Sequence, residues 1–125
     1  MIQGTLILES LREDTTLRGF RFVVREIGRG RARLSEQQMA AGFPDVWSSI
    51  EFELEDERAP ELAPALSGAL DSIGWYANFS SETEVFISFP GRVFRYPRGD
   101  HDGRAEAQAY GRALGIPDHQ LDWSE

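Results

Sequence analysis

The chain has 125 residues, 41% of them hydrophobic, and its 13 basic and 21 acidic residues give a formal net charge of −8. This length corresponds to a single domain, residues 1–125, which can bury a core without help from a metal ion or a disulfide. The sequence contains no cysteine, which excludes disulfides, thiolate nucleophiles and the common zinc-finger and iron–sulfur sites. No cofactor is predicted.

Composition also limits the compartment and the partners. No window holds the roughly 20 apolar residues that span a bilayer, and the first ten residues lack the basic region and cleavage site of a signal peptide. We therefore expect a cytoplasmic protein with no membrane partner. A net acidic chain binds nucleic acid poorly unless its positive charge is concentrated, so a basic protein surface is the expected partner.

Alternation of apolar and polar residues predicts three strands in the first half of the chain, over residues 5–11, 17–27 and 46–54. The glycine and arginine run at residues 28–31 is expected to end the second strand. On the third strand, the side chains expected to face inward are Ile50, Phe52 and Leu54.

A helix is predicted between the turn at residues 56–59 and Gly74, which is expected to stop it. Pro60 and Pro64 must then lie in its first turn or just before it, where a missing N–H costs least. Apolar residues recur at helical spacing and form the expected core face, which consists of Leu62, Leu66, Leu70 and Ile73.

Capping residues predict two further helical segments. Ser35 and Gln38 have the spacing of a capping box, and Gly42 stands where a C-terminal glycine would, which predicts one short helical turn. Asp102 is the predicted N-cap of a helix over residues 103–114, which a glycine and a proline then end. In the acidic tail that follows, the expected anchors are Leu121 and Trp123.

Residues 75–99 contain seven of the fourteen aromatic residues and predict three antiparallel strands. A polar loop at residues 80–83 joins the first two strands, and Pro90 with Gly91 forms a tight type II turn between the last two. The cross-strand pairs that this turn sets are Val85 with Tyr96 and Ile87 with Phe94. The opposite face then carries Phe86, Val93 and Arg95.

The elements follow one another in the order βββαβββα. This order predicts an α+β fold, an antiparallel and mainly meander sheet of about six strands with two helices packed on it. Both faces of the meander at residues 75–98 carry large apolar side chains. One face is expected to meet the helices, and the other is either covered by the rest of the chain or left as an apolar patch.

The residues GWYANF at 74–79 and EVFISFPGRVF at 84–94 resemble a run found in small bacterial proteins of uncharacterised function. The resemblance is limited to residues 74–94. It implies a compact bacterial domain and implies no activity, cofactor or site residue.

Arginines cluster around the last predicted strand, at Arg92, Arg95 and Arg98, and His101 follows them at the start of the second helix region. A helix N-terminus beside guanidinium groups can bind a phosphate or a carboxylate. We therefore predict these four residues as an anion-binding site. Under the competing interpretation, the arginines only balance neighbouring acidic residues, namely Glu84, Asp100, Asp102 and Glu106.

A second group of arginines, Arg29, Arg31 and Arg33, is expected in a flexible loop. These side chains contact phosphates or an acidic partner under one hypothesis, and pair with the acidic residues at 51–57 under the other. Pairing of the second and third strands would also bring two arginines beside two glutamates, Arg21 and Arg25 beside Glu51 and Glu53.

The sequence contains no recognisable catalytic constellation. It has no cysteine, no lysine and no G-x-S-x-G run, and neither histidine has a serine at a telling spacing. Residues 100–103 begin like a calcium loop, but the positions of its first and last acidic ligands hold arginine and alanine. We predict no catalytic residue and no metal ligand.

The leading hypothesis is a non-catalytic, acidic, cytoplasmic protein that acts through protein–protein contact, in the manner of a small regulator or an immunity protein. Trp75 and Phe86 are its predicted contact residues. The expected partner is another protein with a basic surface, and a homo-oligomer is left open. The alternative is an anion-binding protein or enzyme with its site at Arg92, Arg95 and Arg98.

Overall fold

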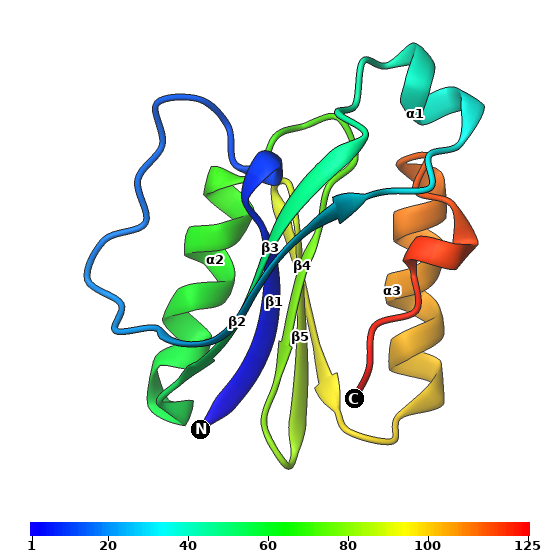
Figure 1. Cartoon of the computed structure of the whole chain (residues 1–125). Helices are drawn as coiled ribbons and strands as arrows, with labels where there is room; N and C mark the ends of the chain where they lie inside the picture. The colour runs from blue at the N-terminus through cyan, green and yellow to red at the C-terminus, as the bar shows by residue number, and fades with distance from the viewer.

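Six strands form one antiparallel sheet in the computed structural model, which describes all residues from 1 to 125 (Figure 1). Their spatial order is β2-β3-β1-β4-β5-β6, and every neighbouring pair is antiparallel. The strands are β1 (Ile2–Ile7), β2 (Val23–Arg31), β3 (Val46–Leu54), β4 (Ala77–Ser80), β5 (Glu84–Phe89) and β6 (Arg92–Pro97). The helices are α1 (Glu36–Ala40), α2 (Ala59–Ala69) and α3 (His101–Ala113). The predicted α+β class with an antiparallel sheet is confirmed.

The sheet lies between two helices, α2 on one face and α3 on the other (Figure 1). The core around α2 includes Leu62, Leu66, Phe52, Phe79 and Phe86. The core around α3 includes Ala107, Val85, Ile87, Phe89 and two residues of the last segment, Leu121 and Trp123. Every residue of β5 after Glu84 is buried. Successive side chains of a strand point to opposite faces of the sheet. Both faces of the meander are therefore covered. None of the helices combines the length and the apolar character needed to cross a membrane.

The first strand ends earlier than predicted and lies at the centre of the sheet, between β3 and β4. The segment Leu8–Ser10 turns into a short 3-10 helix, and the Ser10 hydroxyl donates to the Ile7 carbonyl at 2.5 Å. Its N-terminal limit is also earlier, since Ile2 already pairs with Leu54 of β3. The predicted bounds of residues 5–11 are therefore wrong at both ends, since the strand runs from Ile2 to Ile7.

The second strand is displaced toward the C-terminus relative to its predicted span of residues 17–27. Gly28 and Gly30 do not end it, because both remain paired, opposite Ser49 and Trp47 of β3. Glycine weakens a strand interior, but a continuing partner strand can hold it in the ladder. Of the three arginines expected in a flexible loop, Arg29 and Arg31 thus belong to the edge strand β2, and Arg33 follows its end.

The predicted register of the last hairpin is confirmed: Val85 lies opposite Tyr96, and Ile87 opposite Phe94. Gly91 has a φ of +74°, a conformation that glycine adopts without strain, and it joins β5 to β6 in a tight turn. The first strand of the meander begins at Ala77, so that Trp75 precedes it.

The longer helix differs from its prediction at two places. Pro64 lies inside α2 and not in its first turn. The N–H that Pro64 lacks would bond the Pro60 carbonyl, and both prolines are exposed, so that water can reach this carbonyl. The helix ends at Ala69, and Ile73 beyond it is 42% exposed and not part of the core. The other three predicted core residues are buried, namely Leu62, Leu66 and Leu70.

The capping predictions are confirmed for α1 and corrected for α3. Ser35 and Gln38 form the expected capping box, with both hydrogen bonds at 3.1 Å. The N-cap of α3 is Asp100 and not Asp102: its carboxylate accepts from the Gly103 N–H at 3.1 Å. The helix therefore begins earlier than predicted, at His101.

Gly4, in the middle of β1, leaves room for the side chains of Phe52 and Phe79 on the two neighbouring strands. A Cβ atom at this position would lie 2.6 Å from Phe79 Cβ, 2.7 Å from the Asn78 carbonyl oxygen and 2.8 Å from Phe52 Cζ. Real side chains do not approach so closely, and the Asn78 carbonyl belongs to the paired backbone of β4 and cannot turn away. The core over the central strands depends on the missing side chain.

We expect Gly4→Ala to lower the free energy of unfolding by about 1–3 kcal/mol through overpacking. Gly30→Ala is the matched control, because Gly30 also lies in a strand but a Cβ there would meet nothing within 4 Å. Urea denaturation of both variants measures the difference. Equal stability of the two variants would contradict the proposed role of Gly4.

Candidate functional site

A groove runs over the part of the sheet that α3 leaves uncovered. On this face, β1 carries Thr5, β3 carries Glu51 and Glu53, and β4 carries Asn78, since pairs of opposite residues in a sheet share a face. Two adjoining cavities lie here, of about 580 and 250 Å³, and both are lined by Thr5 and Asn78. We name the two cavities together the sheet groove, with an acidic end and an aromatic end.

The acidic end, the larger cavity, has more carboxylates than cations. The side chains that line it include four acidic residues, Glu51, Glu53, Glu82 and Glu125, and two arginines, Arg25 and Arg98. Met1 also lines this cavity, and its amino group pairs with Asp56 at 3.2 Å. Each arginine is engaged: Arg25 Nε lies 3.6 Å from the Glu53 carboxylate, and Arg98 donates to the Ser81 carbonyl at 3.1 Å.

One of these carboxylates, Glu51, faces a further carboxylate on the neighbouring edge strand. Glu26 of β2 lies directly opposite Glu51 of β3, and neither makes an ion pair. A side-chain hydrogen bond with Glu26, followed by repulsion from its charge, raises the pKa of Glu51. Like charges directly opposite on a sheet destabilise it. No cation of the protein forms an ion pair with either carboxylate to offset this repulsion.

A bulge in β2 creates this pair. The register of β2 against β3 shifts between Val24 and Glu26, which leaves Arg25 as the additional residue. In a regular ladder Arg25 would follow Val24 and face Glu51, as the prediction of arginine–glutamate pairs assumed. The bulge places Glu26 there instead, and Arg25 pairs only with Glu53.

The aromatic end, the smaller cavity, is lined by Trp47 and Tyr76 and by the apolar side chains of Ile7 and Ile116. Trp47 packs against Trp75 with ring centroids 4.9 Å apart. Polar groups at this end come from the sheet and from the last segment of the chain, namely Thr5, Asn78, His119, Gln120 and Asp122.

The Tyr76 hydroxyl is fixed in this cavity, because it donates to the Gln120 carbonyl. Burial, and then the nearby negative charge of Asp122, raises the pKa of Tyr76. Asp122 itself is exposed and takes part in no ion pair. A free carboxylate therefore lies beside an aromatic ring at the mouth of the cavity.

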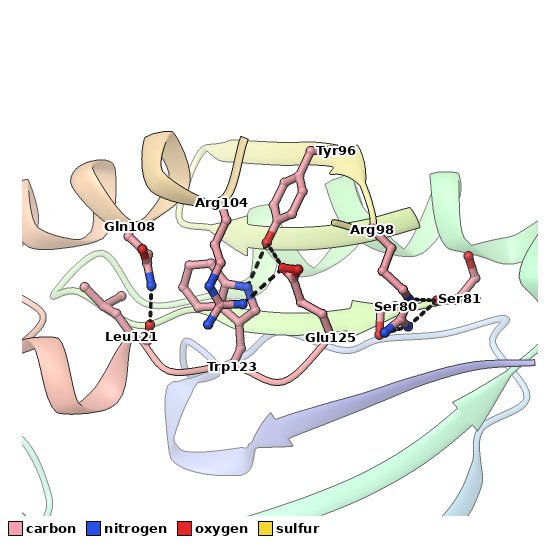
Figure 2. Close-up of polar contacts among 9 residues, drawn as sticks. All are labelled: Ser80, Ser81, Tyr96, Arg98, Arg104, Gln108, Leu121, Trp123 and Glu125. Carbon is pink, nitrogen blue, oxygen red and sulfur yellow. Dashed lines mark hydrogen bonds and ion pairs between the residues drawn. The ribbon is translucent and has the colours of Figure 1, made fainter. Parts of the chain in front are cut away.

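The last segment of the chain forms one wall of the groove and is held by hydrogen bonds to β6 and α3 (Figure 2). The Trp123 indole N–H donates to the Tyr96 hydroxyl at 2.9 Å, and this hydroxyl donates to Glu125 at 2.9 Å. Arg104 pairs with Glu125 at 3.0 Å and lies 5.0 Å from the Trp123 ring centroid. The predicted anchors of the tail are both buried, Leu121 and Trp123.

The structure does not bring the predicted anion-binding arginines together. Arg92 lies over the rings of Phe94 and Tyr110, 4.5 and 5.2 Å from their centroids. Arg95 makes two hydrogen bonds to the Glu84 carboxylate, at 2.5 and 2.8 Å.

The remaining two predicted anion ligands lie apart from those arginines. Arg98 reaches the loop before β5, where it donates to the Ser81 carbonyl and lines the acidic end of the groove. His101 is exposed and is the first residue of α3. At this helix N-terminus the Gly103 N–H already donates to the Asp100 carboxylate. The competing interpretation, charge balance by Glu84, describes Arg95.

The two predicted contact residues lie in the interior. Trp75 is 4% exposed and stacks on Phe43, with ring centroids 4.7 Å apart. Phe86 is 2% exposed, stacks on Phe79 and is covered from outside by Arg95. Both side chains therefore belong to the core, and Trp75 in addition lines the aromatic end of the groove, whereas Phe86 lines neither cavity.

The loop arginines have roles within the sheet. Arg31 pairs with Asp45 at 2.5 Å, and Arg29 donates to the Ser48 hydroxyl at 3.0 Å. Four residues that line the groove were not singled out by the sequence, because they lie on four separate segments: Thr5, Asn78, Trp47 and Asp122. Only their alternation along strands could have placed the first three on one face.

No group of three histidine, aspartate or glutamate side chains is arranged to hold a metal ion. In comparisons with known proteins, no family model, no curated protein and no solved structure matches this chain. The fold and the groove define a small α+β protein with an acidic, partly aromatic groove over one half of its sheet.

The contacts of the last segment contribute to the free energy of unfolding in a way that can be tested at alkaline pH. Burial, and then Glu125, raises the pKa of Tyr96 to about 12, against an opposing effect of the Trp123 N–H. An unfolded tyrosine ionises near pH 10, so the unfolded state loses this proton first and stability should fall between about pH 10 and 12. Because the chain has no lysine and no cysteine, tyrosine is the side chain that titrates in this range.

Tyr96→Phe should be less stable at neutral pH, because the Trp123 N–H loses its acceptor, but its stability should decline less steeply above pH 10. Urea midpoints of the parent and the variant, measured from pH 8 upward, give the two slopes. Identical slopes would show that Tyr96 ionises alike in the folded and unfolded states.

Proposed function

We propose that this protein is a non-catalytic, cytoplasmic binding protein that acts through protein–protein contact, as a small regulator or an immunity protein does, and that its sheet groove holds a basic segment of the partner. The observation that carries the proposal is the Glu26–Glu51 pair, two opposed carboxylates that make no ion pair, of which Glu51 lines the acidic end of the open groove and Glu26 lies beside it on the edge strand. A partner lysine or arginine between them would remove their repulsion.

The wider charge distribution supports the same partner. Carboxylates outnumber arginines at the acidic end, and Asp122 adds an unpaired charge at the aromatic end. The chain as a whole carries −8, which attracts a basic protein over a distance of about one Debye length and repels nucleic acid phosphates. The same charge disfavours a second copy of this chain as the occupant of the groove.

Small-anion binding receives no comparable support. The arginines that would bind an anion are engaged with Glu84, with aromatic rings and with the Ser81 carbonyl. The groove itself presents carboxylates to an incoming phosphate. An anion that raises the melting temperature of the protein in low salt would favour the small-molecule hypothesis over the present one.

Heptalysine serves as the test ligand, with titration calorimetry at neutral pH and low salt as the measurement. We expect binding that weakens as salt is added. Glu26→Gln combined with Glu51→Gln should weaken it roughly 5- to 30-fold, the equivalent of two exposed ion pairs of about 0.5–1 kcal/mol each with some cooperation between them.

Glu57→Gln combined with Glu106→Gln is the matched control. Both residues are exposed, make no ion pair and do not line the groove, and the change in net charge is the same. The control should bind heptalysine as the parent protein does. Absence of binding to the parent, or equal weakening in the two double variants, would contradict the proposal.

A further inference from the structure

We propose that the aromatic end of the sheet groove is a specificity pocket for one arginine side chain of the partner, with Trp47 and Tyr76 against the guanidinium plane and Asp122 as its counter-ion. This inference rests on the proposed function, since it assigns one residue of the basic segment to one part of the groove. It differs from that proposal in predicting discrimination between arginine and lysine.

The size and the lining of the cavity fit a single side chain. Its volume of about 250 Å³ lies below the roughly 300–1,000 Å³ of pockets that enclose drug-sized ligands. It adjoins the acidic end at Thr5 and Asn78. A chain lying along the acidic end could therefore turn one side chain into the aromatic end without leaving the groove.

The aromatic walls favour a planar cation. Tyr76 is held by its hydroxyl on the Gln120 carbonyl, and Trp47 by its contact with Trp75 and by an indole hydrogen bond to the Pro44 carbonyl at 2.8 Å. Both rings are thus fixed before a ligand arrives. Arginine stacks on such rings and is more weakly hydrated than lysine, so it enters an aromatic cavity more readily.

Asp122 supplies the charge that the rings alone would lack. Its carboxylate is close enough to act on the ionisation of Tyr76, and no arginine of this chain pairs with it. The two other acidic side chains of the last segment are already paired, Asp118 with Arg112 at 2.6 Å and Glu125 with Arg104 at 3.0 Å. The one carboxylate left free is the one at the cavity. Asn78 and Thr5 add neutral oxygen acceptors for the remaining N–H groups of a guanidinium.

Three peptides separate this pocket from the general acidity of the groove: heptalysine, the same peptide with arginine at its fourth position, and the same peptide with citrulline there. Citrulline keeps the shape of arginine and removes its charge. We expect the arginine peptide to bind the parent protein about 5- to 10-fold more tightly than heptalysine, and the citrulline peptide to show no such advantage.

Asp122→Asn should reduce the advantage of arginine over lysine to less than about 2-fold, whereas Asp118→Asn should leave it intact. Asp118 is the matched control, because it lies in the same segment but pairs with Arg112 and lines neither cavity. The citrulline comparison needs no variant and keeps the test valid if Asp122→Asn changes the fold.

The possible outcomes separate the two proposals. Equal affinity of the parent protein for heptalysine and the arginine peptide would overturn the pocket, and the proposed function would stand if that binding still depended on Glu26 and Glu51. An arginine advantage that survives Asp122→Asn would overturn the assigned counter-ion and with it the pocket. If none of the peptides binds the parent protein, both proposals fail.

Discussion

The central constraint in this molecule is that the β4–β6 meander has large apolar side chains on both faces. Phe79 and Phe86 must be buried on one side, and Val85, Ile87 and Phe89 on the other. One helix therefore packs on each face, and α3 is needed over β5 and β6. Because α3 covers that half of its face, the same face of β1 and β3 is left open, where the strands carry polar residues. The groove is a consequence of how the core is covered.

One backbone irregularity places an additional negative charge beside the groove. A regular β2–β3 ladder would set an arginine against a glutamate, a neutral and stable arrangement. The bulge at Arg25 replaces this arrangement with two opposed carboxylates. Bulges re-aim side chains at the cost of local pairing, and a cation placed between the two carboxylates would remove their repulsion. The proposed basic partner supplies that cation.

The last segment links the two parts of the structure. Leu121 and Trp123 complete the core beside α3, while Asp122, between them, points its charge to the groove side. Side chains alternate along this segment, so that Leu121 and Trp123 are buried and Asp122 between them is exposed. The hydrogen bonds of Tyr96, Trp123 and Glu125 hold the segment in place (Figure 2). The wall of the groove is therefore as firmly placed as the core it adjoins.

Local patterns in the sequence were enough to determine the α+β class, the hairpin register around Gly91, the capping box at Ser35 and the buried anchors of the tail. Each depends on residues close in sequence, where turn geometry and side-chain alternation act directly. Tertiary structure decided the rest. Trp75 is a core residue because Phe43 and Trp47 pack against it, and Phe86 because Phe79 does. Gly4 matters because side chains of two other strands lie close to it, and Glu26 faces Glu51 because of a bulge that no glycine or proline indicates. The groove joins side chains from separate segments, and their proximity arises only when long-range strand pairing brings β1 between β3 and β4.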